Sequence, residues 1–397
     1  MSIRSIKSLT NLKNKRVLVR VDFNVPIKKG KVRDEARLAA SLPTINYLRK
    51  QKAKVILVTH VGRPEGKRVA ALSVKPIAKH LSVLLNCQIA ILPKWSGMAV
   101  YKTVENMPPG GVVMLENIRF SPEEEKNTRK LAVELAGLAD LFVLDGFAVA
   151  HRAAASVAGV AEFLPSYAGL LIEQEINGLE QVTKRPSHPF VMVIGGAKME
   201  TKVSVIKNLL PRADHILVGG GIVNTYLKAR GYGVGDSLVD DRFKKEVLGY
   251  GKEGKIVWPV DVVVGSATGK RARVVALARR PQRLCASGEA IYDIGPRSIQ
   301  LFATYIKHAH TLVWNGAMGR FEQKPYDVGT LAIARLIAAR SRGKSFGVIG
   351  GGETLQAMAM TGMGEYVDLI STGGGAMLEF LAGKKLPGIE AIKSHAG

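Results

Sequence analysis

The sequence predicts an α/β protein made of two doubly wound, Rossmann-like parallel-sheet domains that are joined by a hinge helix. Short apolar runs of strand length alternate with segments of helical spacing, a pattern typical of parallel sheets covered by helices. The chain of 397 residues exceeds the usual size of one core, and the alternation occurs in two halves of similar length. Four apolar runs after residue 190 also end in glycine clusters, as buried strands that lead into tight turns do.

The first half supplies the first sheet, and we expect this domain to span residues 1–165. Its helices are expected at Arg37–Lys50, Val74–Leu85 and Lys126–Asp140. Its strands are expected at Arg16–Val21, Lys54–Thr59, Gln88–Leu92, Val112–Leu115 and Leu141–Leu144.

A lone helix is expected between the two sheets. The segment Leu164–Glu180 has helical spacing, and Pro165 and Ser166 suit a helix start. A helix of this kind is either a hinge or an ordinary packing helix, and we assign residues 166–184 to the hinge.

The second half repeats the rhythm, and we expect this domain to span residues 185–377. Glycine at a strand end lets the backbone approach a bound group, and a following helix presents free N–H groups to negative charge. The second half therefore predicts a phosphate-binding sheet edge. Its strands are expected at Phe190–Ile194, His215–Val218, Lys255–Val257, Leu312–Trp314, Phe346–Ile349 and Val367–Ile370, and the glycine clusters are Gly195–Gly196, Gly219–Gly221, Gly350–Gly352 and Gly373–Gly375.

Polar and cationic side chains follow the strands of the first half. Because ligands of open α/β sheets bind at the carboxyl ends of strands, these side chains are expected to meet at one edge. Arginines there suit a small molecule that carries phosphate and carboxylate groups. The converging set is Asp22, Asn24, His60, Arg63, Arg119 and Arg152, with Arg37 at the start of the next helix.

Composition excludes several classes of protein. No apolar stretch reaches the roughly 18 residues that a membrane span needs, and the first ten residues lack the apolar core of a signal peptide. Two cysteines make neither a disulfide framework nor a zinc site. We therefore expect a cytoplasmic protein without a membrane partner.

The charge balance is strongly basic, with 57 Lys and Arg against 33 Asp and Glu, a formal net charge of +24. Such a field attracts nucleic acids and small phosphorylated metabolites alike. The basic residues are spread along the chain without a long Lys/Arg tract or an RNA-binding motif. We expect a solvated basic surface and no dedicated nucleic-acid partner.

Several segments in order resemble the phosphoglycerate kinase family over nearly the whole length. Common nucleotide motifs are incomplete: Gly343-Lys344-Ser345 has the tail of a Walker A loop, but Ala338 replaces its first glycine. The matching segments are Arg20–Pro26, His60–Pro64, Glu116–Phe120, His151–Ser156, Gly195–Lys202, Trp314–Gly319, Gly350–Thr354 and Ser371–Ala376.

The resemblance implies reversible phosphoryl transfer from 1,3-bisphosphoglycerate to Mg-ADP, which yields 3-phosphoglycerate and ATP, by a hinge-bending monomer without a general base. It implies that Glu353 binds Mg²⁺ and that the segment from 378 to 397 returns to the first domain. It also implies that the transferred phosphoryl group is stabilised by Arg37, Lys198, Gly373 and Gly374. The implied phosphoglycerate contacts are Asp22, Phe23, Asn24, Arg37, His60, Val61, Gly62, Arg63, Arg119 and Arg152. The implied nucleotide contacts are Lys202, Gly219, Gly220, Asn315, Glu322, Gly350, Gly351, Gly352, Glu353 and Thr354.

Some positions depart from the family pattern. Glu353 stands where the family usually has the aspartate that binds magnesium. Leu144 replaces an asparagine, Ala148 a glycine and Ala154 a histidine. Ala317 replaces a proline. We expect a working metal site, since glutamate keeps the charge and adds one methylene. The alternative is a catalytically weakened relative that binds nucleic acid or another polyanion through its charge.

Overall fold

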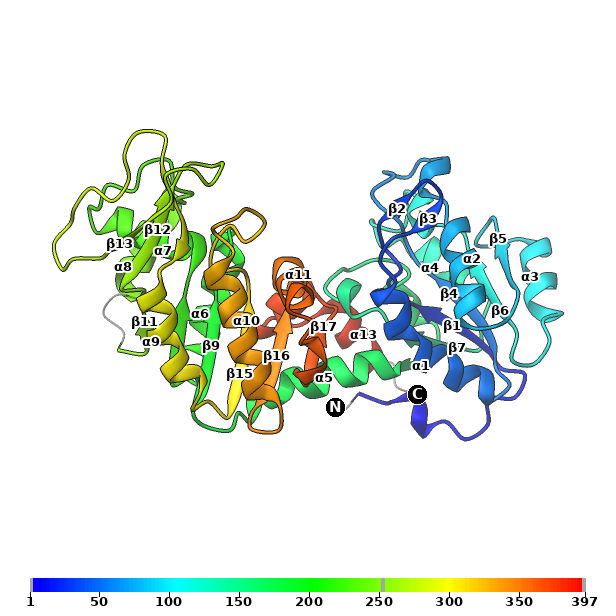
Figure 1. The fold of residues 1–397 in the computed structure, drawn as a ribbon. Helices are drawn as coiled ribbons and strands as arrows, with labels where there is room; N and C mark the ends of the chain where they lie inside the picture. Colours follow the sequence, from blue (N-terminus) through cyan, green and yellow to red (C-terminus); the bar gives the residue numbers. More distant parts are fainter. Residues whose placement is uncertain (1–2, 251–253, 395–397) are drawn as a thin grey trace. The chain divides into compact units, whose positions relative to one another are not determined.

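The computed structural model describes residues 3–250 and 254–394, and the chain forms two compact units. Unit 1 extends to Asn177 and takes up the chain again from Lys385, whereas unit 2 comprises Gly178–Lys384 (Figure 1). Each unit is described by itself below.

Unit 1 is built on a parallel six-stranded sheet with the order β5-β6-β4-β1-β7-β8. Its central strands are buried on both faces, which explains their continuous apolar sequences. The strands are β1 (Arg16–Arg20), β4 (Lys54–Val58), β5 (Ile89–Leu92), β6 (Val112–Leu115), β7 (Leu141–Leu144) and β8 (Ser166–Ala168). The helices are α1 (Ala36–Lys50), α2 (Lys75–Leu84), α3 (Met98–Glu105), α4 (Arg129–Ala136) and α13 (Pro387–Ser394), and β2 (Ile27–Lys28) pairs with β3 (Lys31–Val32) in a small hairpin.

The helix expected at Leu164–Glu180 begins later than predicted. Residues Ser166–Ala168 form β8, which pairs in parallel with Phe142–Leu144, and α5 spans Leu170–Lys184. These residues form a strand despite their helical spacing, because the backbone N–H and C=O groups of β8 form hydrogen bonds with β7. Helix α5 then continues from unit 1 into unit 2.

Unit 2 is built on a second parallel six-stranded sheet, with the order β11-β10-β9-β15-β16-β17. Strand order reverses between β9 and β15, and such a switch point is where open α/β sheets bind ligands. The strands are β9 (Phe190–Ile194), β10 (His215–Val218), β11 (Ile256–Val257), β15 (Thr311–Asn315), β16 (Phe346–Gly350) and β17 (Leu369–Ser371). The helices are α6 (Met199–Leu209), α7 (Gly220–Ala229), α8 (Lys244–Tyr250), α9 (Pro296–Ile306), α10 (Val328–Ser341), α11 (Gly352–Thr361) and α12 (Gly375–Leu381).

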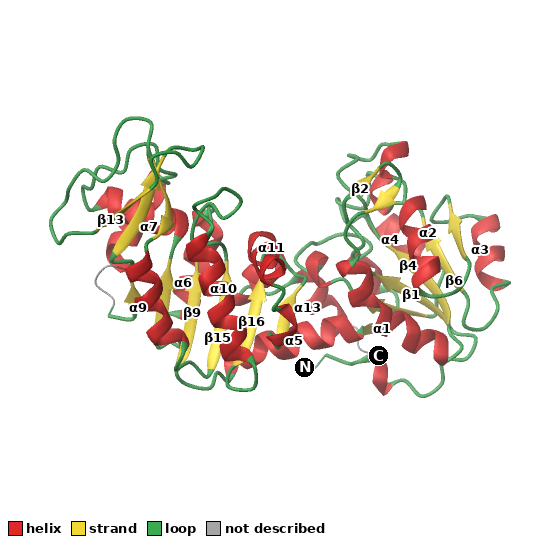
Figure 2. Ribbon diagram, viewed as in Figure 1, coloured by secondary structure: helices red, strands yellow, loops and turns green. Residues whose placement is uncertain are grey.

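An antiparallel three-stranded sheet in unit 2 was not predicted. It consists of β12 (Asp261–Gly265), β13 (Arg273–Ala276) and β14 (Ala290–Ile294) in the order β13-β12-β14. The sequence has short apolar runs here, Val262–Val264 and Val274–Leu277, but they are joined by a basic loop rather than by a helix, so the strand–helix alternation used for the parallel sheets did not find them. Figure 2 shows these strands in yellow beside α7.

The fold class and the parallel sheets agree with the sequence prediction. Unit 1 buries β1, β4, β6 and β7 side chains in its core, and unit 2 packs Trp314, fully buried, among residues of α9 and α10. No helix within the described residues is long and apolar enough to cross a membrane. In both units the polar segments that follow the parallel strands come to the same sheet edge.

Candidate functional site

Four charged or titratable side chains cluster at the carboxyl ends of β1 and β4 in unit 1. The buried carboxylate of Asp22 forms an ion pair with Nη1 of Arg37, and its Oδ1 lies 3.8 Å from Nδ1 of His60. Arg20 is 2% exposed, and its Nη2 lies 3.3 Å from the same His60 nitrogen. The predicted residues Asp22, His60 and Arg37 are therefore brought together, and the structure adds Arg20.

His60 lies in a strongly cationic environment. Burial lowers its pKa well below the usual value of 6.5, and Arg20, Arg119, Arg152 and Arg37 lower it further. A neutral imidazole can accept one hydrogen bond and donate another. His60 therefore serves as a polar contact and leaves the positive charge to the arginines.

Three guanidinium groups, those of Arg20, Arg119 and Arg152, line one cavity of about 220 Å³ in unit 1. Burial lowers the pKa of Arg119, and the charge of Arg152 lowers it further. The exposed side chain of Glu125 lies between two of these cations, with its Oε1 3.0 Å from Arg119 and 3.9 Å from Arg152. The cavity thus has a surplus of positive charge that a phosphate would neutralise.

The loop after β4 is held by the other predicted residues. The Gly62 N–H donates to Oδ1 of Asn24 at 2.9 Å, and the Gly62 carbonyl accepts from Nη1 of Arg119 at 2.8 Å. The Phe23 and Val61 side chains are buried, while the Arg63 side chain is exposed. Its charge still acts on Arg119, whose pKa it lowers.

In unit 2, Lys202 and Asn315 meet at the switch point between β9 and β15. Nζ of Lys202 donates to Oδ1 of Asn315, and Nδ2 of Asn315 donates to the Gly350 carbonyl at 2.6 Å. Burial lowers the pKa of Lys202 to about 8, while the Glu353 carboxylate opposes this shift. At neutral pH a lysine with this pKa is still mostly protonated, and a phosphate bound beside it would favour the charged form further.

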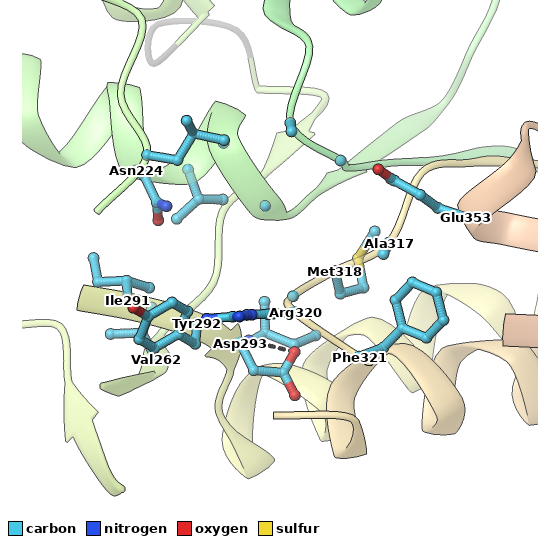
Figure 3. Close-up of a pocket in the computed structure, with 18 of the residues that line it drawn as sticks. Asn224, Val262, Ile291, Tyr292, Asp293, Ala317, Met318, Arg320, Phe321 and Glu353 are labelled. Atoms are coloured by element: carbon cyan, nitrogen blue, oxygen red, sulfur yellow. Dashed lines mark hydrogen bonds between the residues drawn. The ribbon is translucent and has the colours of Figure 1, made fainter. Parts of the chain in front are cut away.

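Glu353 is exposed near the start of α11, and its Oε2 lies 3.0 Å from the position that a Cβ on Gly196 would occupy. Figure 3 shows its carboxylate directed toward the loop that follows β9. Magnesium at phosphate sites is usually held by one or two carboxylates together with phosphate oxygens. A single accessible carboxylate beside Lys202 and a glycine loop fits that donor set.

A cavity of about 250 Å³ adjoins these residues, and Gly220, Glu322 and Glu353 line it. The Arg320 guanidinium lies 5.6 Å from the ring centre of Tyr292 at one wall (Figure 3). Burial raises the pKa of Asp293, another wall residue, to about 8, and its carboxyl accepts from the N–H groups of Gly329 and Ile294. Most of the wall is apolar, as expected for a nucleoside-sized pocket.

Two glycine turns bring backbone close to this cavity. Gly220 has a φ of +56°, and a Cβ there would lie 2.7 Å from the Gly196 nitrogen. Gly351 has a φ of +97°, and a Cβ there would lie 2.9 Å from Nδ2 of Asn315. Both positions therefore need glycine, because a side chain would be strained and would clash.

The remaining predicted positions surround this edge. Thr354 accepts from the Gly316 N–H at 2.7 Å, Gly219 is buried against Met318, and Gly352 begins α11. Gly373 and Gly374 lie in the turn between β17, the strand that pairs with β16, and α12. Lys198 is exposed just before the start of α6. Within the described residues, Lys198 forms no hydrogen bond with Gly373 or Gly374.

Sequence reasoning missed several residues of both sites. Arg20 ends β1, and its place directly after the apolar run Val17–Val19 was the signal available in the sequence. Glu125 belongs to an acidic run that is typical of an exposed surface. In unit 2, Asn224 lies one helical turn after the Gly219–Gly221 cluster. The apolar wall residues carry no signal of their own, because they resemble ordinary core residues.

The fold and the two sites define an α/β protein of two doubly wound units, each with anion-binding groups at the carboxyl edge of its sheet. The sequence pattern of the phosphoglycerate kinase family matches residues 6–384. The chain is 46% identical over 399 residues to the phosphoglycerate kinase of Pelotomaculum thermopropionicum, with 99% of each covered, and 47% identical over 388 residues to that of Pseudothermotoga lettingae, with 96% of each covered.

Solved structures agree with these sequence relatives. Phosphoglycerate kinase from Coxiella burnetii matches with a TM-score of 0.87 and 37% identity over 100% of both chains. The enzyme from Pyrococcus horikoshii matches with a TM-score of 0.85 and 32% identity over 99% of both. The chain belongs to the phosphoglycerate kinase family.

Proposed function

We propose that this protein catalyses reversible phosphoryl transfer from 1,3-bisphosphoglycerate to Mg-ADP, giving 3-phosphoglycerate and ATP. The observation that carries the proposal is the pairing of two anion sites in a chain of this family. One is the arginine cavity of unit 1, and the other is the Lys202, Asn315 and Glu353 cluster at the switch point of unit 2.

The chemistry requires no general base. In the direction that consumes ATP, the acceptor is a carboxylate, which is already ionised at neutral pH. Catalysis then depends on positioning and on neutralising the charge of the transferred group. The described clusters supply lysine, arginine and backbone N–H groups for that purpose, which supports the proposal.

We assign the phosphoglycerate to unit 1. Arg63, Arg119 and Arg152, with neutral His60, would hold the phosphate that is not transferred. Asp22 and Asn24 would accept from the hydroxyl group or orient their neighbours, and Arg37, paired with Asp22, would turn toward the reacting carboxyl group.

We assign the nucleotide to the cavity of unit 2. The apolar walls would take the base, Glu322 the ribose hydroxyls, and Lys202 the phosphates. Glu353 would hold the magnesium ion, which supplies charge neutralisation between the phosphate oxygens. Lys198 and the N–H groups of Gly373 and Gly374 are proposed to contact the group in transit.

Transfer requires the two bound ligands to meet with water excluded. We propose that the units close around the ligands by bending at α5, and that the enzyme acts as a cytoplasmic monomer. The number of protomers is measurable by light scattering, with and without both ligands.

A matched pair of variants tests the assignment of the two sites. Arg119→Ala should raise the KM for 3-phosphoglycerate about 10- to 1000-fold and leave the dissociation constant of ADP unchanged, since it removes a bidentate phosphate partner. Lys202→Ala should weaken ADP binding and spare phosphoglycerate binding. A coupled assay of ATP consumption, with calorimetry for each ligand, gives both readouts.

Different results would refute the proposed activity and the proposed assignment of ligands to units. Folded parent protein without Mg-ATP-dependent consumption of 3-phosphoglycerate would refute the activity. An active parent in which Arg119→Ala weakens ADP, or Lys202→Ala weakens phosphoglycerate, would refute the assignment of ligands to units.

A further inference from the structure

A second cavity of unit 2, of about 400 Å³, adjoins the later residues of α7 rather than its glycine-rich start. Its walls come from the carboxyl-terminal half of α7, from the loop between β11 and β12, and from the segment that follows β13. We call it the α7 cavity, and it is lined by Val223, Tyr226, Leu227, Arg230, Tyr232, Trp258, Pro259, Val260, Leu277, Ala278 and Arg279.

One wall of the α7 cavity is a rigid aromatic pair. The rings of Tyr226 and Trp258 stack with centroids 3.6 Å apart and an angle of 15° between their planes. Arg230 fixes this pair, since its Nη1 donates to the Tyr226 hydroxyl at 2.9 Å and its guanidinium lies 5.7 Å from the ring centre. A flat aromatic wall that is already in place favours a flat ligand, because little side-chain entropy is lost on binding.

Another part of the wall is held by a hydrogen bond from a side chain to the backbone. The Tyr232 hydroxyl donates to the Ala278 carbonyl, which ties the segment after β13 to the end of α7. Leu277 and Ala278 thereby face the cavity together with Val260 and Leu227. The interior is thus apolar, and a ligand gains affinity by burying apolar surface there.

The rim carries positive charge without a balancing acid. Arg230 and Arg279 are exposed, and neither forms an ion pair with an acidic side chain in the part of the chain that the structure describes. The segment from Val262 to Gly288 contains six Lys and Arg and no Asp or Glu, and its Arg273 is paired with Glu289 outside it. An apolar interior below two unpaired guanidinium groups is complementary to an anion with an apolar body.

The α7 cavity adjoins the proposed nucleotide cavity through one residue. Val223 lines both, and Gly220 and Gly221 at the start of the same helix line the nucleotide cavity. The two cavities have no other lining residue in common, so each can hold a ligand of its own.

We propose that the α7 cavity is a second ligand site, distinct from the phosphoglycerate and nucleotide sites, that binds a planar aromatic molecule carrying one anionic group. The ring lies against the Tyr226–Trp258 pair and the apolar residues that line the same cavity. The anionic group is held at the rim by Arg230 and Arg279. The proposal does not depend on the assignment of ligands in the catalytic reaction.

Naphthalene-2-carboxylate is a suitable probe, and the indole N–H signal of Trp258 is the readout. The chain has three tryptophans, and Trp95 and Trp314 lie outside the α7 cavity. In ¹⁵N-labelled full-length protein saturated with Mg-ADP, the probe should shift the Trp258 signal saturably and leave the other two unchanged. The Trp258→Phe variant identifies the signal.

Charge and shape are tested separately. The double variant Arg230→Gln and Arg279→Gln should weaken the probe at least about fivefold, because it removes both charge-assisted contacts. The matched control, Lys270→Gln and Arg271→Gln, removes the same charge outside the cavity and should bind as the parent does. The neutral naphthalene-2-carboxamide should bind at least about fivefold more weakly than the carboxylate.

Three outcomes would overturn the proposal. They are the absence of a saturable shift at Trp258, equal binding of the carboxylate and the carboxamide, and equal loss of affinity in both double variants. Competition between the probe and Mg-ADP would place the probe in the nucleotide cavity and would also overturn it. Kinase activity of the double variants confirms that they are folded.

Discussion

Asp145 is fully buried at the end of β7 and shows how a single carboxyl couples folding to pH. Its Oδ1 accepts from the Thr44 hydroxyl at 2.7 Å and from the Leu171 N–H at 3.1 Å, while its Oδ2 has no partner among the described residues. Burial raises its pKa from 3.8 to about 7, against the effect of those hydrogen bonds. The folded protein therefore binds more protons than the unfolded chain between these two values, and stability falls as pH rises through this window.

Asp145→Asn tests this coupling. The amide keeps the Oδ1 acceptor and cannot ionise. Between pH 5 and pH 8, the free energy of unfolding of the variant should therefore change by about 2–3 kcal/mol less than that of the parent. Urea unfolding across that range gives the measurement. The exposed Asp236→Asn serves as control, and an unchanged pH profile in Asp145→Asn would show that Asp145 is ionised in the folded protein.

Glu125 occupies the place between Arg119 and Arg152 where a phosphate is proposed to bind. Glu125→Gln should tighten 3-phosphoglycerate binding about two- to fivefold, because the phosphate no longer displaces an exposed ion pair worth up to about 1 kcal/mol. Calorimetry compares the parent with this variant and with Glu123→Gln, whose carboxylate pairs with Lys130 instead. Unchanged binding in Glu125→Gln would show that Glu125 does not compete with the phosphate, and weaker binding would show that it supports the site.

Glu353 is proposed to hold magnesium despite its extra methylene. Glu353→Ala should lower kcat about 100-fold or more, whereas Glu353→Asp should stay within about tenfold of the parent, since it keeps the charge. Turnover is measured against magnesium and manganese concentration. A large gain in Glu353→Asp would show that glutamate handicaps this enzyme, and no loss in Glu353→Ala would remove the metal role.

At the scale of elements, the start of α5 depends on tertiary partners. The Leu170 N–H donates to the Thr44 hydroxyl of α1 at 2.9 Å, and the Leu171 N–H donates to Asp145 after β7. The first turn of α5 therefore receives its caps from two other elements. Sequence spacing alone predicted an earlier start at Leu164.

Thr44→Val should destabilise unit 1 by about 1–3 kcal/mol, because it leaves the Leu170 N–H and Asp145 short of one partner while keeping the side-chain shape. Thr304→Val is the control, since the exposed Thr304 hydroxyl donates to the carbonyl of Leu301 on the same helix. Urea unfolding of both variants decides the point. Equal stability of the two would show that water replaces the Thr44 hydroxyl.

At the scale of the whole molecule, the net charge of +24 acts on both anionic substrates. Raising the NaCl concentration from about 10 mM to 300 mM shortens the screening length from about 30 Å to under 8 Å, so KM for both substrates should rise several-fold. Steady-state kinetics at fixed free magnesium measures this. Salt-independent KM values would mean that only local contacts attract the substrates.

Much of the fold was predictable because the apolar runs that indicate its strands are short stretches of consecutive residues. Apolar runs such as Val112–Leu115 and Phe190–Ile194 coincide with β6 and β9, since strands buried on both faces must be apolar throughout. The antiparallel strand β13 was not predicted, because its apolar run is only a few residues long and its place is set by pairing with β12 rather than by alternation with helices. Likewise, the pocket walls around Tyr292 and Asp293 follow from packing between distant segments.

The sequence by itself determined the two parallel sheets, the glycine turns at their edges and the family, because these depend on residue type and order. Only the tertiary structure decided that Ser166–Ala168 is a strand, that Glu125 lies between Arg119 and Arg152, and that Lys202 is buried against Asn315. These features arise from residues far apart in the chain. Their energies depend on burial and neighbouring charge, which a residue acquires only when the chain is folded.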